Sequence, residues 1–270
     1  MKIGKTTQVQ SAICTSNEDS ITVRGADLCR DLIGHIGFSD YFHLLLTGER
    51  PSPAASRVLE ATLVAITEHG LVPSVQAARM TLAAAPDALQ GAVAAGILGC
   101  GSVILGASET AGRLFVEIDK LAGPDGDISA VTAAARTVVT ALRERGQAVP
   151  GYGHPQHKAR DPRVDRLFTV SREAGGGQRF VQIAEAVEAV LPGITGRDLR
   201  LNVSAAIPAV LLGVGFPVAA MRGVPILART AGLIAHLAEE MRSPVGFALS
   251  YNATREQVYT GAPAPTPTQP

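Results

Sequence analysis

Apolar residues recur at helical spacing through most of this chain, and glycine or proline interrupts the pattern at short intervals. This pattern is typical of a protein built from many short helices that pack on one another. Strand signals are confined to two short runs, 11–16 and 20–23, which predict a hairpin. The fold class is therefore predicted to be all-α with a small N-terminal β-hairpin. Helices are predicted at residues 26–33, 39–46, 51–68, 73–80, 86–101, 111–121, 127–145, 163–173, 179–190, 198–212 and 224–241.

Alanine and glycine are concentrated in residues 86–101, and small side chains let neighbouring helices approach closely. We therefore expect this segment at the centre of the molecule. Two apolar stretches, 92–107 and 205–221, are shorter than the roughly 20 residues that span a bilayer, and both contain glycine. We expect them to be buried helices of a soluble protein that has no membrane partner.

Composition excludes several classes of function. The 24 basic and 24 acidic residues give a net charge of zero, so no basic face for nucleic acid is expected. Cys14, Cys29 and Cys100 have no paired spacing, which argues against a disulfide framework or a zinc site and favours a reducing cytoplasm. No apolar run follows the lysines near the N-terminus, so no signal peptide is expected.

The strongest functional signal is a glycine-rich loop. Residues 150–154 read P-G-Y-G-H, and D-P-R follows at 161–163. Glycine allows turns and close approach of the backbone to a ligand, and His154 can exchange a proton near neutral pH. Lys158, Arg160 and Arg163 can bind a carboxylate or phosphate, and Asp161 can hold one of these cations in place. Without further matches, the same letters would also describe an ordinary turn that contains a histidine.

This loop resembles the signature loop of the citrate synthase family. Three further segments carry the resemblance in the same order, namely S-A-I-C-T at 11–15, the stretch 66–79, and A-R-T-A-G-L-I-A-H at 228–236. Length and N-terminus are most similar to citryl-CoA lyases and to the citryl-CoA lyase module of ATP-citrate lyase. The resemblance extends from residue 11 to about 261.

The resemblance implies an all-α, citrate synthase-like fold in which a large and a small helical domain meet at a cleft. Carried onto this chain, the small domain is residues 106–214, and the large domain is 1–105 together with 215–260. Residues 261–270 are rich in proline and are expected to form a flexible tail. The resemblance also implies a homodimer that closes its domains over the ligand.

Site residues follow from the resemblance position by position. His154 is the implied catalytic group that exchanges the proton of the substrate's hydroxyl or carbonyl oxygen. A coenzyme A thioester and a 2-oxo acid are the implied small-molecule partners, and neither a metal nor a tightly bound cofactor is expected. The implied binding residues are His69, Arg163 and Arg229 for substrate carboxylates, and Gly151, Tyr152, Gly153 and Lys158 for coenzyme A.

Two catalytic positions depart from the family's citrate synthases. Ile104 stands where a histidine would stabilise the enol, a residue that ATP-citrate lyase modules also lack. Ser204 stands where an aspartate would exchange the carbon-bound proton, and a serine hydroxyl is a poor base without a partner. Ser204 is therefore assigned a weak or altered catalytic role. Near the C-terminus, Arg255 stands one place out of register for an arginine that reaches the ligand across the dimer, and Glu256 follows it.

Three hypotheses arise from these observations. The first is a citryl-CoA lyase-like carbon–carbon lyase or synthase that interconverts a 3-hydroxy-acyl-CoA with a 2-oxo acid and a short acyl-CoA. The second is a non-catalytic homologue that binds an acyl-CoA or a polycarboxylate as a sensor or partner subunit. The third keeps catalysis but forms the enolate by decarboxylation, which would make the missing base unnecessary.

Overall fold

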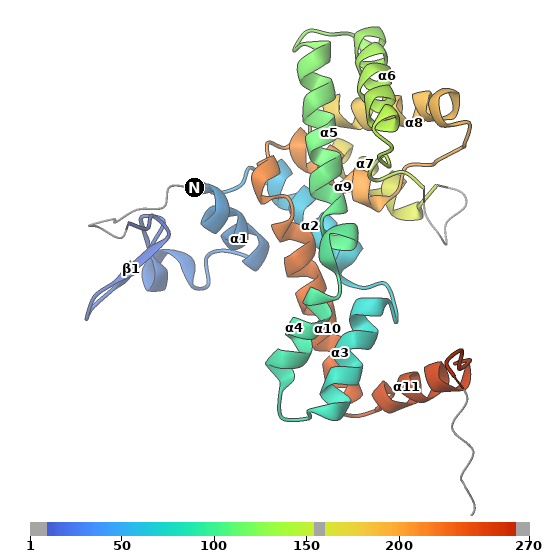
Figure 1. Ribbon diagram of the computed structural model, residues 1–270. Helices are drawn as coiled ribbons and strands as arrows, with labels where there is room; N and C mark the ends of the chain where they lie inside the picture. The colour runs from blue at the N-terminus through green and yellow to red at the C-terminus, as the bar shows by residue number, and fades with distance from the viewer. Residues whose placement is uncertain (1–9, 154–159, 263–270) are drawn as a thin grey trace, which may run out of the picture. The chain divides into compact units, whose positions relative to one another are not determined.

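The computed structural model describes residues 10–153 and 160–262, and their arrangement is drawn in Figure 1. Helices dominate and the strands form one small sheet, so the predicted all-α fold class with an N-terminal hairpin is confirmed. The strands and short helices are β1 (Cys14–Ser16), β2 (Ile21–Val23), β3 (Ala26–Asp27), the π-helices η1 (Leu28–Leu32) and η2 (Gly101–Leu105), and the 3-10 helix η3 (Val218–Ala220). The α-helices are α1 (Phe38–Thr47), α2 (Pro53–Thr67), α3 (Pro73–Ala84), α4 (Leu89–Leu98), α5 (Ala107–Ala122), α6 (Ile128–Glu144), α7 (Pro162–Glu173), α8 (Arg179–Thr195), α9 (Val203–Gly213), α10 (Gly223–Glu240) and α11 (Gly246–Arg255).

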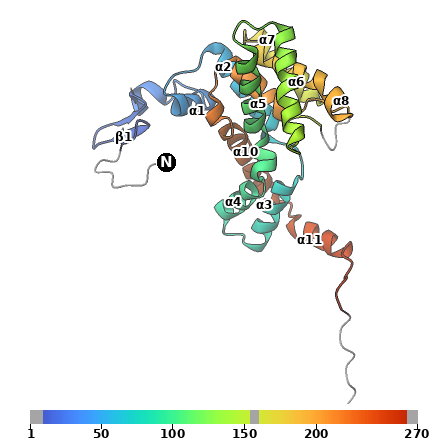
Figure 2. The same ribbon diagram turned by 45° about the horizontal axis from the view of Figure 1, so that its top comes forward.

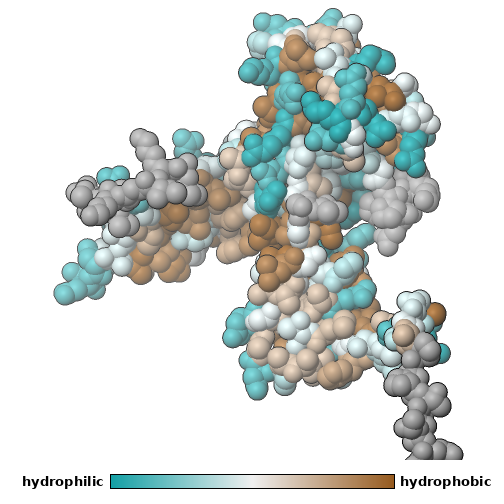
Figure 3. Space-filling model, in the orientation of Figure 1, coloured by the Kyte–Doolittle hydropathy of each residue, from teal (hydrophilic) through white to brown (hydrophobic). Residues whose placement is uncertain are grey.

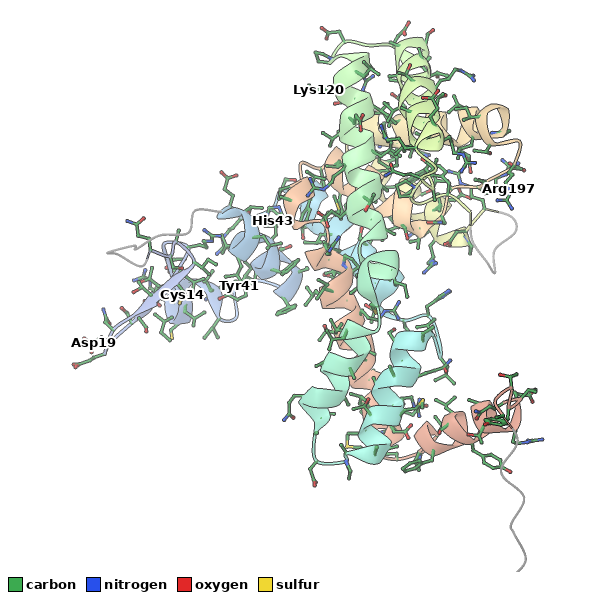
Figure 4. All side chains as sticks on the ribbon, viewed as in Figure 1. Cys14, Asp19, Tyr41, His43, Lys120 and Arg197 are labelled. Carbon is green, nitrogen blue, oxygen red and sulfur yellow. The ribbon has the colours of Figure 1, made fainter. Side chains whose placement is uncertain are left out.

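The N-terminal sheet is antiparallel in the order β1-β2-β3. The side chain of Asn17 accepts the N–H groups of Asp19 and Ser20 at 2.9 and 2.8 Å, which closes the hairpin turn. Figure 4 shows Cys14 on this sheet and Asp19 at the hairpin turn, and it shows Tyr41 and His43 on α1. His43 is buried and its Nδ1 lies 3.1 Å from the Glu49 carbonyl oxygen, which agrees with a structural role.

The helix predicted for residues 26–33 is wrong at both ends. Residues 26–27 form the third strand, and the Asp27 side chain then accepts the N–H groups of Cys29 and Arg30. The short π-helix that follows closes with the Ile33 N–H on the Leu28 carbonyl. Because Asp27 caps the turn, the helical pattern begins later than the apolar spacing indicated.

Contacts divide the chain into two compact units. The first comprises the described residues of 1–67 and 102–228, and the second those of 68–101 and 229–270. Helix α10 begins in the first unit and ends in the second. The division at 106–214 stays a prediction.

The first unit has its core where α2 and the helices from α5 to α9 pack together. Helices α5, α6, α7 and α8 gather in the same region in the two views of Figure 1 and Figure 2. Helix α9 is buried along most of its length, which confirms the expected buried helix for residues 205–213. The rest of that apolar stretch, up to residue 221, does not continue the helix. The largest fully buried side chains here are Leu59, Phe115, Ile118, Ile183, Leu191, Leu201, Ile207, Leu211, Phe216 and Met221.

The second unit packs α3 and α4 against the C-terminal part of α10. A Cβ added to Gly96 would lie 2.7 Å from Leu233 Cδ1 and 2.9 Å from the Ser74 carbonyl oxygen, so only glycine permits this approach. Small residues therefore do bring helices together, as predicted. The expectation of a fully buried helix is wrong for α4, because only Ala92 and Gly96 are buried and Leu98 is 82% exposed.

Among the described helices, the stretch Val218–Glu240 is long and apolar enough to span a membrane, judged by its 23 residues and mean hydropathy of 1.3. A core helix of a folded protein meets the same criterion. Leu233 and Leu237 on this helix are fully buried among residues of α3 and α4.

Helix α11 was not predicted, and a buried carboxylate explains where it starts. Glu240 Oε1 accepts the N–H groups of Val245 and Gly246 at 2.9 and 2.7 Å, while Oε2 lies 2.6 Å from Arg79 Nε. Burial acts to raise the pKa of Glu240, but the two backbone donors and Arg79 outweigh it and hold the pKa below its usual value.

The lowered pKa of Glu240 predicts an acid-dependent loss of stability. Because the folded pKa lies below the unfolded value, the carboxylate stabilises the fold above that unfolded value, and its contribution is lost as pH falls through the folded pKa. We expect Glu240→Gln to flatten the decline of the unfolding free energy below about pH 4.5. Urea unfolding at several pH values measures this, and an unchanged slope would contradict the assignment.

Candidate active site

The glycine-rich loop is held by the segment just before α9. Tyr152 forms an isolated antiparallel β-bridge with Leu201. The Gly153 N–H donates to the Arg200 carbonyl at 2.7 Å, and the Asn202 side-chain amide donates to the Gly153 carbonyl at 2.6 Å. Hydrogen bonds therefore hold both backbone polar groups of Gly153, the residue that precedes His154. His154 and Lys158 themselves lie outside the described residues.

Gly151 is in the left-handed region, with φ at +86°, and it touches the first turn of α9. An added Cβ would lie 2.5 Å from the Ala205 Cβ and 2.9 Å from the Ala205 Cα. The Gly151 carbonyl also accepts the N–H of Asn202 at 3.0 Å. Glycine was predicted here for close approach to a ligand, and in the structure the close approach is to α9.

Replacing Gly151 by alanine is expected to lower the unfolding free energy by about 2–5 kcal/mol, the sum of left-handed strain and steric overlap. Gly175 is a matched control, because its φ is +79° and nothing lies within 4 Å of an added Cβ. Gly175→Ala should cost only the strain, about 1–2 kcal/mol. Denaturant unfolding of both variants tests the comparison, and equal losses would show that contact with α9 is unimportant.

The side chain of Tyr152 lies in the core of the first unit. Its ring is buried, and its hydroxyl donates to the Ala184 carbonyl at 2.8 Å. Burial raises the pKa of this phenol well above its usual value. The Tyr152 hydroxyl thus has a hydrogen-bond partner in the core, and the contact of Tyr152 with coenzyme A stays a prediction.

Asp161 and Arg163 form a fixed pair at the start of α7. Arg163 Nε and Nη2 donate to the two Asp161 carboxylate oxygens at 3.0 and 2.8 Å, a bidentate geometry that restrains the guanidinium. Asp161 is 1% exposed, and it also accepts the backbone N–H of Arg163 as the cap of α7. The predicted holding role of Asp161 is confirmed by these contacts.

The same carboxylate reaches α9. Asp161 Oδ2 accepts the N–H of Val203, the first residue of α9, at 3.3 Å. Burial acts to raise the pKa of Asp161, but Arg163 and the two backbone N–H donors outweigh it, so the pKa lies below its usual value. Asp161 is therefore a charged group that joins two helix N-termini, where the helix dipoles favour a negative charge.

Ser204 lies in the first turn of α9, directly after Val203. Its N–H donates to the Asn202 side-chain oxygen at 2.9 Å, which makes Asn202 the N-cap of the helix. Ser204 is half-buried. The first unit thus brings together the glycine-rich loop, Arg163 and Ser204. Asn202 and Asp161 link these segments through hydrogen bonds.

Arg163 also lines an open, largely apolar groove of about 810 Å³ within the first unit. The start of α1, one face of α2 and the first half of α7 form its walls. Arg57 and Arg166 line the same groove, and Arg57 is paired with Glu173 at 2.7 Å.

Ile104 lies in the π-helix η2, immediately before α5, and is 41% exposed. A hydrocarbon side chain at this position can offer no hydrogen bond to a thioester oxygen. Glu109 follows in α5 and pairs with Arg222 at 2.7 Å and with Arg113 at 2.8 Å. Glu109 therefore links α5 to the residue just before α10.

His69 and Arg229 belong to the second unit. His69 is half-buried, and its backbone N–H donates to Glu68 Oε1 at 2.8 Å. Arg229 is half-buried on α10, and its Nη1 is fully buried without a hydrogen-bond partner among the described residues. A buried guanidinium nitrogen needs an acceptor, and a ligand carboxylate is a suitable one.

The residues that the structure describes contain no cluster of His, Cys, Asp or Glu arranged to hold a metal ion. Arg255 lies at the end of α11 and is exposed. Sequence reasoning also missed a cluster in the second unit that connects Arg79 to Glu68. The sequence did contain a signal for this cluster, because Arg79 on α3 and Glu240 on α10 are charged residues on apolar helices, and buried charges must be paired.

A family model described as the C-terminal domain of citrate synthase matches residues 34–246. The chain therefore belongs to the citrate synthase family.

Two solved structures resemble this chain over most of its length. Citryl-CoA lyase from Hydrogenobacter thermophilus has a similar structure, with a TM-score of 0.82, 32% identity and coverage of 96% of both chains. ATP citrate lyase from Methanothrix soehngenii, solved with citrate and coenzyme A, shares the fold with a TM-score of 0.72 at 24% identity, over 89% of this chain and 40% of that one.

Curated sequences give the same family at lower coverage. Citrate synthase from Haloferax volcanii is 27% identical over 74% of this chain and 50% of its own length. A putative citrate synthase 2 from Mycobacterium bovis is 30% identical over 71% of this chain and 49% of its own length. The chain thus spans about half the length of these curated relatives.

Proposed function

We propose that this chain is a carbon–carbon lyase or synthase of the citryl-CoA lyase type. Its substrate class is a 3-hydroxy-acyl-CoA, which it interconverts with a 2-oxo acid and a short acyl-CoA. The observation that carries the proposal is the bidentate Asp161–Arg163 pair, which offers a restrained cation beside the loop that leads to His154. The similarity to citryl-CoA lyase along nearly the full length of both chains supports it.

In the cleavage direction, His154 takes the proton of the substrate hydroxyl. The oxygen's electron pair forms the carbonyl of the 2-oxo acid as the neighbouring carbon–carbon bond breaks. The electrons of that bond pass to the acyl-CoA fragment as its enolate, which gains a proton at carbon. Arg163, Arg229 and His69 bind carboxylates, while Ser204 stands where the carbon proton is handled.

The test is direct incubation of the purified protein with citryl-CoA, followed by mass spectrometry for oxaloacetate and acetyl-CoA. Arg163→Leu serves as the comparison, because it removes the cation without touching His154. We expect product from the wild type and a large loss in the variant. The absence of product from a folded wild-type protein would count against the proposal.

A second function is favoured by a specific observation, the replacement of two catalytic groups at Ile104 and Ser204. In this alternative the chain binds an acyl-CoA or polycarboxylate without turnover. The double variant Ile104→His, Ser204→Asp discriminates between the two. If activity arises only in the double variant, the natural chain is a binder.

We also propose that the chain works as a homodimer through α4 and the neighbouring part of α10. Leu89, Leu98 and Ile234 are 40%, 82% and 50% exposed. In Figure 3 the visible face of the region of α3 and α4 carries few hydrophilic residues, unlike the region of α5 and α6. Exposed apolar surface of this kind is typical of a protein–protein interface.

Replacing Leu98 by glutamate is expected to weaken the dimer by at least about tenfold, because an unpaired carboxylate would be buried on association. Leu121→Glu is the control, since Leu121 is 56% exposed on α5 in the other unit. Sedimentation velocity over a range of concentrations measures both variants. A dimer that weakens equally in the two variants would place the interface elsewhere.

A further inference from the structure

A cluster of charged side chains in the second unit connects α3, α10 and the turn at His69. Arg79 is 3% exposed, and its Nε and Nη1 lie 2.6 Å from the carboxylates of Glu240 and Glu239 respectively. Arg79 Nη1 also lies 3.3 Å from Nδ1 of His236. A fully buried arginine is thus in contact with the imidazole.

The contact with Arg79 fixes the tautomer of His236. An arginine can only donate, so Nδ1 of His236 must offer its lone pair, and the ring proton stands on Nε2. Nε2 lies 2.8 Å from Glu68 Oε2, on the opposite side of the ring, with the N–H directed obliquely to that oxygen. The imidazole therefore presents its N–H side to one oxygen of the Glu68 carboxylate.

The other oxygen of Glu68 holds the backbone next to it. Oε1 accepts the N–H groups of His69 and Gly70 at 2.8 and 2.5 Å. Gly70 has a φ of +76°, so the chain turns sharply at this point. Burial acts to raise the pKa of Glu68, but His236 and the two backbone donors outweigh it, so the pKa lies below its usual value.

We infer that His236 is a positioning residue for His69. His236, oriented by Arg79, anchors Glu68, and the anchored carboxylate fixes the backbone that carries the His69 side chain. The Glu68 side chain is 48% exposed, so without His236 only the two backbone N–H groups would hold its carboxylate in competition with water. The inference rests on the proposed function, in which His69 binds a carboxylate of the 2-oxo acid.

The first experiment is calorimetric titration with oxaloacetate. We expect His236→Leu to weaken binding on the order of tenfold, the factor that about 1.4 kcal/mol produces. His236→Gln should recover most of the affinity, because its amide N–H can replace Nε2. His35→Leu is the control, since His35 is an exposed histidine in the first unit.

A double-mutant cycle distinguishes positioning through Glu68 from a general structural effect. Glu68→Ala should weaken oxaloacetate binding as much as His236→Leu, and the double variant should lose no more than either alone. Additive losses would overturn the inference, because His236 would then act independently of Glu68. Unchanged affinity in both single variants would overturn it as well.

A readout without substrate separates this inference from the proposed function. The imidazole carbon–proton NMR signal of His69, assigned with a His69→Asn variant, should shift in His236→Leu and in Glu68→Ala but not in His35→Leu. If the signal shifts while the wild type binds no oxaloacetate, positioning stands and the proposed function fails. If the signal stays unchanged in both variants, the inference is wrong whatever the protein binds.

Discussion

Replacement of Arg79 by methionine is expected to lower the free energy of unfolding by about 3–5 kcal/mol, the typical cost of removing one partner from a buried ion pair. Methionine keeps much of the volume of the side chain but no charge. Glu240, which is 2% exposed in its side chain, would then remain buried without its cation. The loss should also weaken the start of α11, because the same carboxylate caps that helix.

Urea unfolding followed by circular dichroism measures the effect of Arg79→Met. Arg57→Met is a matched control, because the Arg57–Glu173 pair is about half exposed on both sides, and exposed pairs contribute about 0–1 kcal/mol. Similar losses in the two variants would mean that burial of the Arg79–Glu240 pair does not set its contribution.

Replacement of His154 by glutamine is expected to lower kcat for the proposed cleavage by about 10²–10⁴-fold, the usual contribution of a general acid or base. Glutamine retains polarity and approximate size but cannot take the hydroxyl proton. The change should appear in kcat more than in KM, because carboxylate binding is assigned to His69, Arg163 and Arg229. Steady-state kinetics with citryl-CoA supply both constants.

The control for His154→Gln is His35→Gln, which removes an exposed histidine of the first unit and should leave both constants unchanged. Retention of wild-type kcat in His154→Gln would exclude this histidine as the proton acceptor. A folded variant by circular dichroism is the condition for either conclusion.

Helix positions were predictable from sequence because spacing and capping act locally. The helix predicted at residues 127–145 is α6, and the Asp127 side chain caps it by accepting the Ala130 N–H at 2.9 Å. Helix α11 was missed because its first N–H groups are held by Glu240, a residue of the preceding helix, rather than by a local cap. Contacts of that kind leave no periodic pattern.

The candidate site likewise combines features that local sequence predicts with features that depend on contacts between distant parts of the chain. That Asp161 would hold one of the cations near it followed from their closeness in the sequence, and the structure identifies that cation as Arg163. The roles of Gly151 and Tyr152 did not, because they depend on which part of the chain folds against the loop. Neither residue carries a local signal that distinguishes contact with a ligand from contact with Ala205 or Ala184.

The contacts of Asp161 limit which substitutions the candidate site can tolerate at this position. One carboxylate caps α7, restrains Arg163 and holds the first N–H of α9, so a single substitution disturbs all three at once. Even glutamate, which is longer by one methylene, would displace at least one of these contacts. In laboratory evolution toward new acyl groups, we therefore expect position 161 to stay invariant. Accepted substitutions should accumulate at positions whose side chains hold fewer structural contacts, such as Ser204.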